Sequence, residues 1–249
     1  MDQDTITFQL ATHFLPKVAL RLENLLLTIE QACDETHPVV HHYALKNLLE
    51  IVKLIEKPEL KSRFLKELMR IEHISTNKSE TRIPSQLYAN LFEQIQFLNH
   101  VAGRFGESVQ NDPFLQSVRI SLTGDNNDCA MQSPQLLFWL ENKPSKRQAD
   151  LTHWLKELKS LQETVNLYLF LLRSIANFDQ IDMVNGFYQR SLPSRTSCHL
   201  ILLNIDKKYG MVPKMQLGHH GLSLRLCEAG SMNELRYTKT AVNLGICQI

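Results

Sequence analysis

Apolar residues recur three and four positions apart through most of the first 178 residues, which is the spacing of buried helix faces. The pattern predicts helices from Pro16 to the segment 34–37, over 39–56, from Pro58 to a loop at 75–82, from Pro84 to about 102, and over 113–122, 134–140 and 146–177. Proline begins several of these segments, as it does in first helical turns. Thr5–Leu10 alternates instead and is typical of a short strand.

The period changes after Phe178, where alternation replaces helical spacing. We expect strands over Ile181–Arg190, His199–Ile205 and Leu222–Leu226. In the last of these, three leucines alternate with Ser223 and Arg225, which places Arg225 on the solvent face of a half-buried strand. The sequence therefore predicts an α+β protein. A mostly helical domain covers residues 1–178, and a small antiparallel β-rich domain covers 179–249. The strand near 5–10 is expected to join the sheet of the second domain.

Composition is that of a globular protein, with 43% hydrophobic and 21% charged residues. The net charge is only +1, but residues 181–249 carry eight lysines and arginines against four acids. A basic C-terminal region fits a local site for an acidic partner, and ordinary scatter of surface charge explains it equally well.

Cysteine usage and the N-terminus favour a cytoplasmic protein. The five cysteines are widely spaced and form no C-x-x-C pair, which suits a reducing compartment. The first ten residues, MDQDTITFQL, carry acids where a signal peptide needs basic residues. No apolar run reaches the roughly 18 residues of a membrane span.

Motifs for catalysis and for metal or cofactor binding are missing from the sequence. It has no nucleotide-binding glycine loop, nucleophile elbow or H-E-x-x-H motif. His37 and His41 have helical spacing, but Pro38 between them places His37 outside the helix. We expect no metal, no cofactor and no enzymatic activity; an enzyme whose site is dispersed along the sequence remains an alternative without a residue to support it.

Nucleic-acid binding is a further alternative, because one predicted helix carries a basic face. The residues of that face are Lys61, Arg63, Lys66 and Arg70. Glu59 and Glu67 dilute its charge, and the pI of about 7.7 is low for a nucleic-acid-binding domain. A solvated helix face explains these residues better.

Four segments, in their order and spacing, resemble one family. They are residues 20–23 (LRLE), 64–70 (FLKELMR), 129–140 (CAMQSPQLLFWL) and 185–189 (NGFYQ). Together they resemble ZapD, a family of cell-division proteins that associate with FtsZ and the Z ring. The likeness runs from about Phe8 to the end of the predicted sheet region.

The resemblance implies a cytoplasmic homodimer without enzymatic activity, located at the mid-cell division site. It implies a helical N-terminal and a β-rich C-terminal domain. It further implies binding to the C-terminal tail of FtsZ, the tubulin-like division GTPase, and cross-linking of FtsZ filaments into bundles that support Z-ring assembly and septation. A two-fold dimer carries two copies of a tail site and so can bridge two filaments.

The resemblance also implies which basic side chains receive the tail. The matching positions are Arg21, Arg119, Arg147 and Arg225. Further candidates are Lys214, His219 and His220. Arg21 and Arg119 lie in predicted helices, where an ion pair within the chain is an equal alternative. Basic positions of the family are replaced here at Pro113, Leu137 and Gly221, and Lys207 and Lys208 are nearby lysines that could compensate for them.

Overall fold

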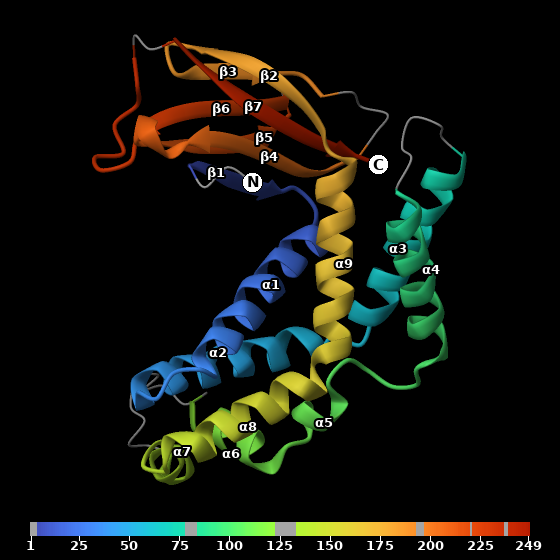
Figure 1. Cartoon of the computed structure of the whole chain (residues 1–249), viewed down its shortest axis with the longest axis vertical. Coiled ribbons are helices and arrows are strands. Elements are labelled where there is room, and N and C mark those ends of the chain that lie inside the picture. The colour runs from blue at the N-terminus through green and yellow to red at the C-terminus, as the bar shows by residue number, and fades with distance from the viewer. Residues whose placement is uncertain (1–3, 78–83, 123–132, 193–196, 220, 237–238) are drawn as a thin grey trace. The chain divides into compact units, whose positions relative to one another are not determined.

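The computed structural model describes residues 4–77, 84–122, 133–192, 197–219, 221–236 and 239–249 (Figure 1). The chain divides into two compact units, and each is considered by itself. Residues 18–72 and 85–168 form the helical unit, and residues 1–17, 73–84 and 169–249 form the sheet unit. Helices come first and an antiparallel sheet follows, which confirms the predicted α+β class.

Most of the described helices begin and end close to the predicted positions, although the short helix Glu107–Gln110 was not predicted. The helices are α1 (Phe14–Ala32), α2 (Pro38–Ile55), α3 (Leu60–Asn77), α4 (Ser85–His100), α5 (Glu107–Gln110), α6 (Pro113–Leu122), α7 (Pro134–Leu140), α8 (Pro144–Glu157) and α9 (Lys159–Ile175). Side chains cap α2, α6 and α7. The His37 ring accepts a hydrogen bond from the Val39 N–H, the Asp112 carboxylate accepts one from the Leu115 N–H, and the Ser133 hydroxyl accepts one from the Leu136 N–H. In the described part of the chain, each helix is too short or too polar to cross a lipid bilayer.

Aromatic rings mark the centre of the helical unit. Phe64 of α3 is fully buried and meets Tyr168 of α9 edge to face, with ring centroids 5.5 Å apart. The Phe105 ring also meets the Phe64 ring edge to face, with ring centroids 6.2 Å apart. A second cluster joins Phe114 and Trp154, whose stacked rings lie 5.8 Å apart. Such pairs add specific geometry to the burial of apolar surface.

Two predictions for the helical region are wrong in detail. The single helix expected over 146–177 is two helices, because the chain breaks at Leu158. The Leu158 side chain is fully buried and packs so closely on Gly106 that a Cβ atom there would lie 2.5 Å from it. Tertiary packing thus overrides a sequence without proline or glycine. Helix α3 also runs to Asn77, into the expected loop at 75–82; the rest of that loop and the turn expected at 123–128 lie outside the described residues.

Within the described residues, seven strands form one antiparallel sheet in the order β1-β4-β7-β2-β3-β6-β5 (Figure 1). They are β1 (Thr5–Ala11), β2 (Asn177–Val184), β3 (Phe187–Arg190), β4 (Cys198–Asp206), β5 (Met211–Gly218), β6 (Gly221–Glu228) and β7 (Lys239–Gln248). Strand β1 pairs with β4 along its whole length, from Thr5 opposite Asp206 to Ala11 opposite Leu200. The N-terminal segment is therefore an edge strand of the C-terminal sheet.

The strand expected over Ile181–Arg190 is instead the hairpin β2–β3. Its turn residues Asn185 and Gly186 have φ angles of 54° and 66°, which is the left-handed pair that tight hairpin turns require. A Cβ atom at position 186 would lie 2.3 Å from the Leu235 carbonyl oxygen, so only glycine fits. Strands β5 and β7 were not predicted, since Pro213 and Gly245 interrupt their alternation.

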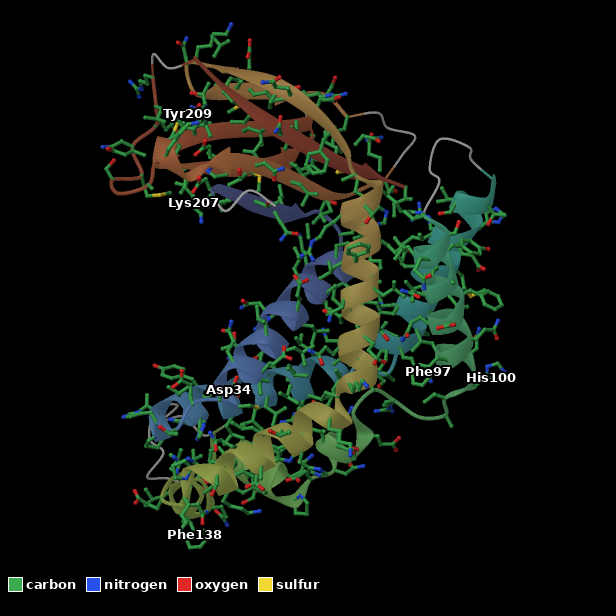
Figure 2. All side chains as sticks on the ribbon, in the orientation of Figure 1. Asp34, Phe97, His100, Phe138, Lys207 and Tyr209 are labelled. Atoms are coloured by element: carbon green, nitrogen blue, oxygen red, sulfur yellow. The ribbon has the colours of Figure 1, made fainter. Side chains whose placement is uncertain are left out.

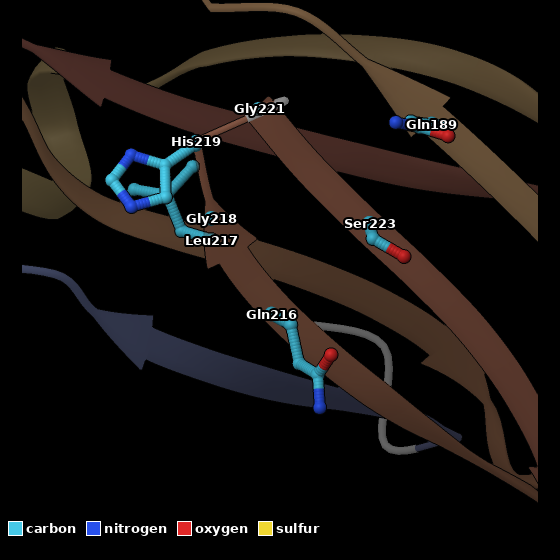
Figure 3. A pocket seen from close by; sticks show the side chains of 7 residues that line it. All are labelled: Gln189, Gln216, Leu217, Gly218, His219, Gly221 and Ser223. Carbon is cyan, nitrogen blue, oxygen red and sulfur yellow. The ribbon is translucent and has the colours of Figure 1, made fainter.

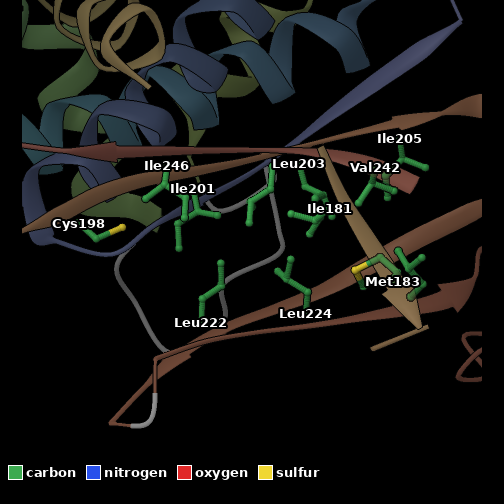
Figure 4. Close-up of a cluster of buried hydrophobic side chains, with 12 residues drawn as sticks. Ile181, Met183, Cys198, Ile201, Leu203, Ile205, Leu222, Leu224, Val242 and Ile246 are labelled. Atoms are coloured by element: carbon green, nitrogen blue, oxygen red, sulfur yellow. The ribbon is translucent and has the colours of Figure 1, made fainter. Parts of the chain in front are cut away.

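Apolar side chains from four strands make the core of the sheet unit (Figure 4). Leu222, Leu224 and Leu226 of β6 are fully buried in it. Arg225 lies between the last two and is exposed, which confirms the predicted alternation. The face of β6 opposite the core therefore carries Ser223 and Arg225.

Candidate partner-binding site

Arg147 of α8 is buried, with 3% of its surface exposed. Its guanidinium donates hydrogen bonds to the Leu140 carbonyl oxygen at 2.8 Å, to that of Thr36 at 2.7 Å and to that of Asn142, and its Nε donates to His41 Nδ1 at 2.8 Å. Burial lowers the pKa of His41, which favours the neutral ring that accepts this bond. All three guanidinium nitrogens have partners inside the protein, so we give Arg147 a structural role in the helical unit.

Arg119 and Arg21 form ion pairs on the surface of the helical unit. Arg119 of α6 meets both carboxylate oxygens of Glu56, one of them at 2.8 Å, and this hydrogen bonding raises the pKa of Arg119. Arg21 of α1 lies 2.7 Å from Glu50, and 56% of its side chain is exposed. Arg21 thus keeps more of its surface for a partner than Arg119, whose side chain is 31% exposed.

Arg225 of β6 contacts a carboxylate and an aromatic ring on the surface of the sheet unit. Its Nη1 atom donates to Glu234 Oε2 at 2.7 Å, with 49% of the arginine side chain exposed. Its guanidinium carbon lies 5.0 Å from the centre of the Phe187 ring. An aromatic ring below and a carboxylate beside it hold the guanidinium in one orientation while one side faces solvent.

Strand pairing shows which side chains share the face with Arg225. Phe187 of β3 lies directly across from Arg225, and Lys214 of β5 faces Arg225 from the other side. We call these three residues the cationic row. Lys214 is exposed and pairs with no carboxylate in the part of the chain that the structure describes. Two cations thus lie side by side on neighbouring strands, where one carboxylate could contact both.

A second row runs parallel to the first, two residues away from it on each of the three strands. Gln189 of β3 faces Ser223 of β6, which in turn faces Gln216 of β5. We call these three residues the amide row. It lies in an open depression of about 460 Å³ (Figure 3). The residues that line the depression are Gln189, Gln216, Leu217, Gly218, His219, Gly221 and Ser223.

The histidine candidates have different outcomes. His219 follows β5 and is one of the residues that line this depression (Figure 3). His220 lies outside the described residues. Lys214 and His219 therefore belong to the same unit as Arg225, and Lys214 also shares its face, whereas Arg21, Arg119 and Arg147 belong to the helical unit.

Other basic side chains are engaged within the chain. Lys207 and Tyr209, labelled in Figure 2, begin and end a short 3₁₀ turn before β5. Between them, Lys208 pairs with Asp206 at 2.6 Å and lies 5.0 Å from the centre of the Tyr209 ring. Neither lysine lies in the cationic or the amide row.

The basic helix considered for nucleic acids is α3. Arg63 lies 3.9 Å from Glu59 and Arg70 lies 3.6 Å from Glu67. Lys61 donates to the carbonyl oxygens of Val101 and Gly103. Three of its four basic side chains are therefore occupied by neighbours in the same unit, which gives no support to a phosphate-binding surface.

Sequence reasoning missed Glu234 and the amide row. Glu234 is positioned by a bridge to Cys227 and by the hydrogen bond from the Leu235 N–H to the Leu226 carbonyl oxygen, 3.0 Å long. The Asn185-Gly186 pair could have revealed the hairpin that brings Phe187 and Gln189 beside β6. No sequence signal sets the register between β5 and β6, so Lys214 could not be placed next to Arg225.

Comparison with known proteins gives consistent matches. Residues 20–225 match the family model for ZapD, described as a cell division protein. Cell division protein ZapD of Coxiella burnetii is 26% identical over 228 residues, covering 89% of this chain and 88% of that protein. The protein of the same name from Vibrio vulnificus is 26% identical over 82% of each chain, and that of Nitrosomonas eutropha is 25% identical over 88% of this chain and 89% of its own.

Proposed function

Because this chain belongs to the ZapD family of cell division proteins, we propose that it binds the C-terminal tail of FtsZ and cross-links FtsZ filaments into bundles. It acts by binding and not by catalysis. The observation that carries this proposal is the cationic row, in which Arg225, placed over the Phe187 ring, lies across from the exposed Lys214. A short acidic tail is the partner that such a surface suits best.

The chemistry of the row supports a carboxylate ligand. The planar guanidinium fork of arginine pairs with a carboxylate through two parallel hydrogen bonds, and a lysine beside it adds a second positive charge. The Phe187 ring removes water from one face of the guanidinium, which strengthens its charged hydrogen bonds. Arg225 and Lys214 are therefore the proposed primary contacts, and His219, beyond the end of β5, is a more distant candidate.

Arg21 and Arg119 are proposed as secondary contacts, because both are already paired with glutamates, Glu50 in α2 and Glu56 directly after it. A tail carboxylate would have to replace those partners. Exposed ion pairs contribute about 0.2–1 kcal/mol, so such replacement is feasible at Arg21. Arg147 would act only indirectly, by supporting the helical unit.

Bundling requires more than one tail site in each particle. We propose a homodimer, because a two-fold axis gives two copies of the cationic row and allows one particle to join two filaments. A filament displays many tails, so modest affinity at each site is sufficient once several are engaged. The protein would then act at the cytoplasmic mid-cell division site, where it supports Z-ring assembly and septation.

Two measurements test the proposal. Purified protein at equimolar ratio should increase the light scattering and the pelleted fraction of FtsZ polymerised with GTP. A fluorescent FtsZ tail peptide should bind with salt-sensitive anisotropy, and Arg225→Gln should weaken binding about tenfold or more, since hydrogen bonds to charged groups contribute about 1.5–3 kcal/mol. Unchanged pelleting together with no peptide binding would exclude the proposed function.

Arg190→Gln is the matched control for Arg225→Gln. Arg190 of β3 is also a half-exposed arginine of the same sheet, paired with Asp179 at 3.0 Å. It faces Leu222 across the strands, away from the cationic row. Binding within twofold of the wild type is expected for this variant, and an equal loss in both variants would show a general charge effect.

A further inference from the structure

The depression next to the cationic row has a chemistry different from that row. The amide row presents two amides and a hydroxyl, and the described residues that line the depression include no carboxylate or ammonium group. Gln189 and Gln216 are exposed and Ser223 is half-buried. Each amide supplies two donors and one acceptor, which are the groups that pair with peptide N–H and C=O. The surface thus changes from charged to neutral hydrogen bonding within two residues along β6.

The strand geometry sets the dimensions of this surface. Ser223 and Arg225 are two residues apart on one face of β6, hence separated by about 6.6 Å. Gln189 and Gln216 lie on the two strands that flank β6, so the amide row is about 9.6 Å wide. An extended peptide advances about 3.3 Å per residue, so two to three residues span the distance from the cationic row across the amide row.

We infer that this depression is a neutral subsite that receives two or three uncharged residues of the bound tail in extended conformation, directly beside the acidic group held by Arg225. The inference rests on the proposed function and adds the second half of the recognition surface. Gln189, Ser223 and Gln216 hydrogen-bond the peptide backbone. The cationic row attracts the tail, and the amide row selects an uncharged segment beside its acidic group.

Gly218 allows the subsite to be filled without distorting the strand. It lies two residues beyond Gln216 on the same face and faces Gly221 across the hairpin. A Cβ atom at position 218 would meet no atom within 4 Å, and its φ angle is outside the left-handed range. Gly218→Val therefore places a side chain in the depression, with open space around its Cβ atom. Gly230→Val is the matched control, because Gly230 has the same open surroundings but does not line the depression.

The test measures tail-peptide anisotropy at several salt concentrations on the full chain. We expect Gly218→Val to weaken binding at least fivefold with an unchanged salt slope, whereas Arg225→Gln weakens binding and flattens the slope. The double variant Gln189→Ala/Gln216→Ala should act like Gly218→Val, since two neutral hydrogen bonds contribute about fivefold or more. If Gly218→Val does not fold, the double variant alone tests whether the neutral subsite contributes to binding.

Each outcome separates the inference from the proposed function. If the wild type binds and Arg225→Gln weakens binding, but Gly218→Val and the double variant stay within twofold of Gly230→Val, the subsite is excluded and the proposed function stands. If the subsite variants also flatten the salt slope, they act through Arg225, and the neutral subsite is again excluded. If the wild type does not bind the peptide at any salt concentration, the proposed function itself fails.

Discussion

Replacement of Arg147 by methionine gives the sharpest test of its structural role. Methionine has a similar length and no hydrogen-bond donor, so the variant leaves three carbonyl oxygens and His41 Nδ1 without the partner they have in the wild type. Each buried acceptor left without a donor costs about 1–3 kcal/mol. Partial access of water to the carbonyl oxygens makes the total cost smaller than the sum over the four acceptors. Removal of one partner of a buried charged network typically costs about 3–5 kcal/mol.

We therefore expect Arg147→Met to lower the free energy of unfolding by about 3–5 kcal/mol, a large part of the roughly 5–15 kcal/mol available to a folded protein. In urea unfolding followed by circular dichroism, this loss moves the midpoint down by roughly 1–2 M. Arg119→Met is the control in the same unit. Its ion pair with Glu56 is partly exposed, so its loss should cost no more than about 1 kcal/mol.

Two results would refute this reasoning. A free energy of unfolding for Arg147→Met within 1 kcal/mol of the wild type would mean that the buried network contributes little. Loss of tail-peptide binding in a variant of undiminished stability would mean that the guanidinium contacts the tail, as the family resemblance alone suggests. Binding measured at a temperature where Arg147→Met is fully folded distinguishes these cases.

Two further predictions concern charge. Glu234→Gln should strengthen tail-peptide binding about twofold to fivefold, because it removes a carboxylate that competes with the tail for Arg225. The control Glu228→Gln removes the same charge nearby without touching Arg225. An equal gain in binding for both variants would contradict competition for Arg225. The free energy of unfolding should fall as pH decreases below 6.5, since burial lowers the pKa of His41 from 6.5 and the unfolded chain then takes up the proton first. Urea titrations at several pH values measure this, with a shallower slope expected for His41→Gln; a wild-type value that stays flat below pH 6.5 would contradict it.

Local patterns were sufficient for most elements. Helical spacing located α2, α6 and α7 because their buried faces coincide with one stripe of apolar residues, and proline begins each of them. Alternation placed Arg225 opposite the core because strand side chains point to opposite faces in turn. These features depend on neighbours within a few residues, which the sequence displays directly.

Features that depend on distant segments could not be obtained in this way. Arginine is seldom buried, and the burial of Arg147 depends on Thr36 and His41, more than a hundred residues earlier in the chain. The break at Leu158 depends on its contact with Gly106. The cationic row depends on the register of β5 against β6, which neither strand encodes alone. Each of these three features is visible only once the folded structure of one unit is known.

The order of strands in the sheet constrains how the protein can be made. Strand β7 follows the other strands in the chain, yet it lies between β4 and β2 in the middle of the sheet. During translation, β4 and β2 must therefore keep unpaired edges until residues 239–248 emerge from the ribosome, whereas the helical unit depends on segments synthesised earlier. Those open edges invite pairing with other chains, so a stop codon just before β7 would yield a product that aggregates and not one that merely lacks a terminal strand.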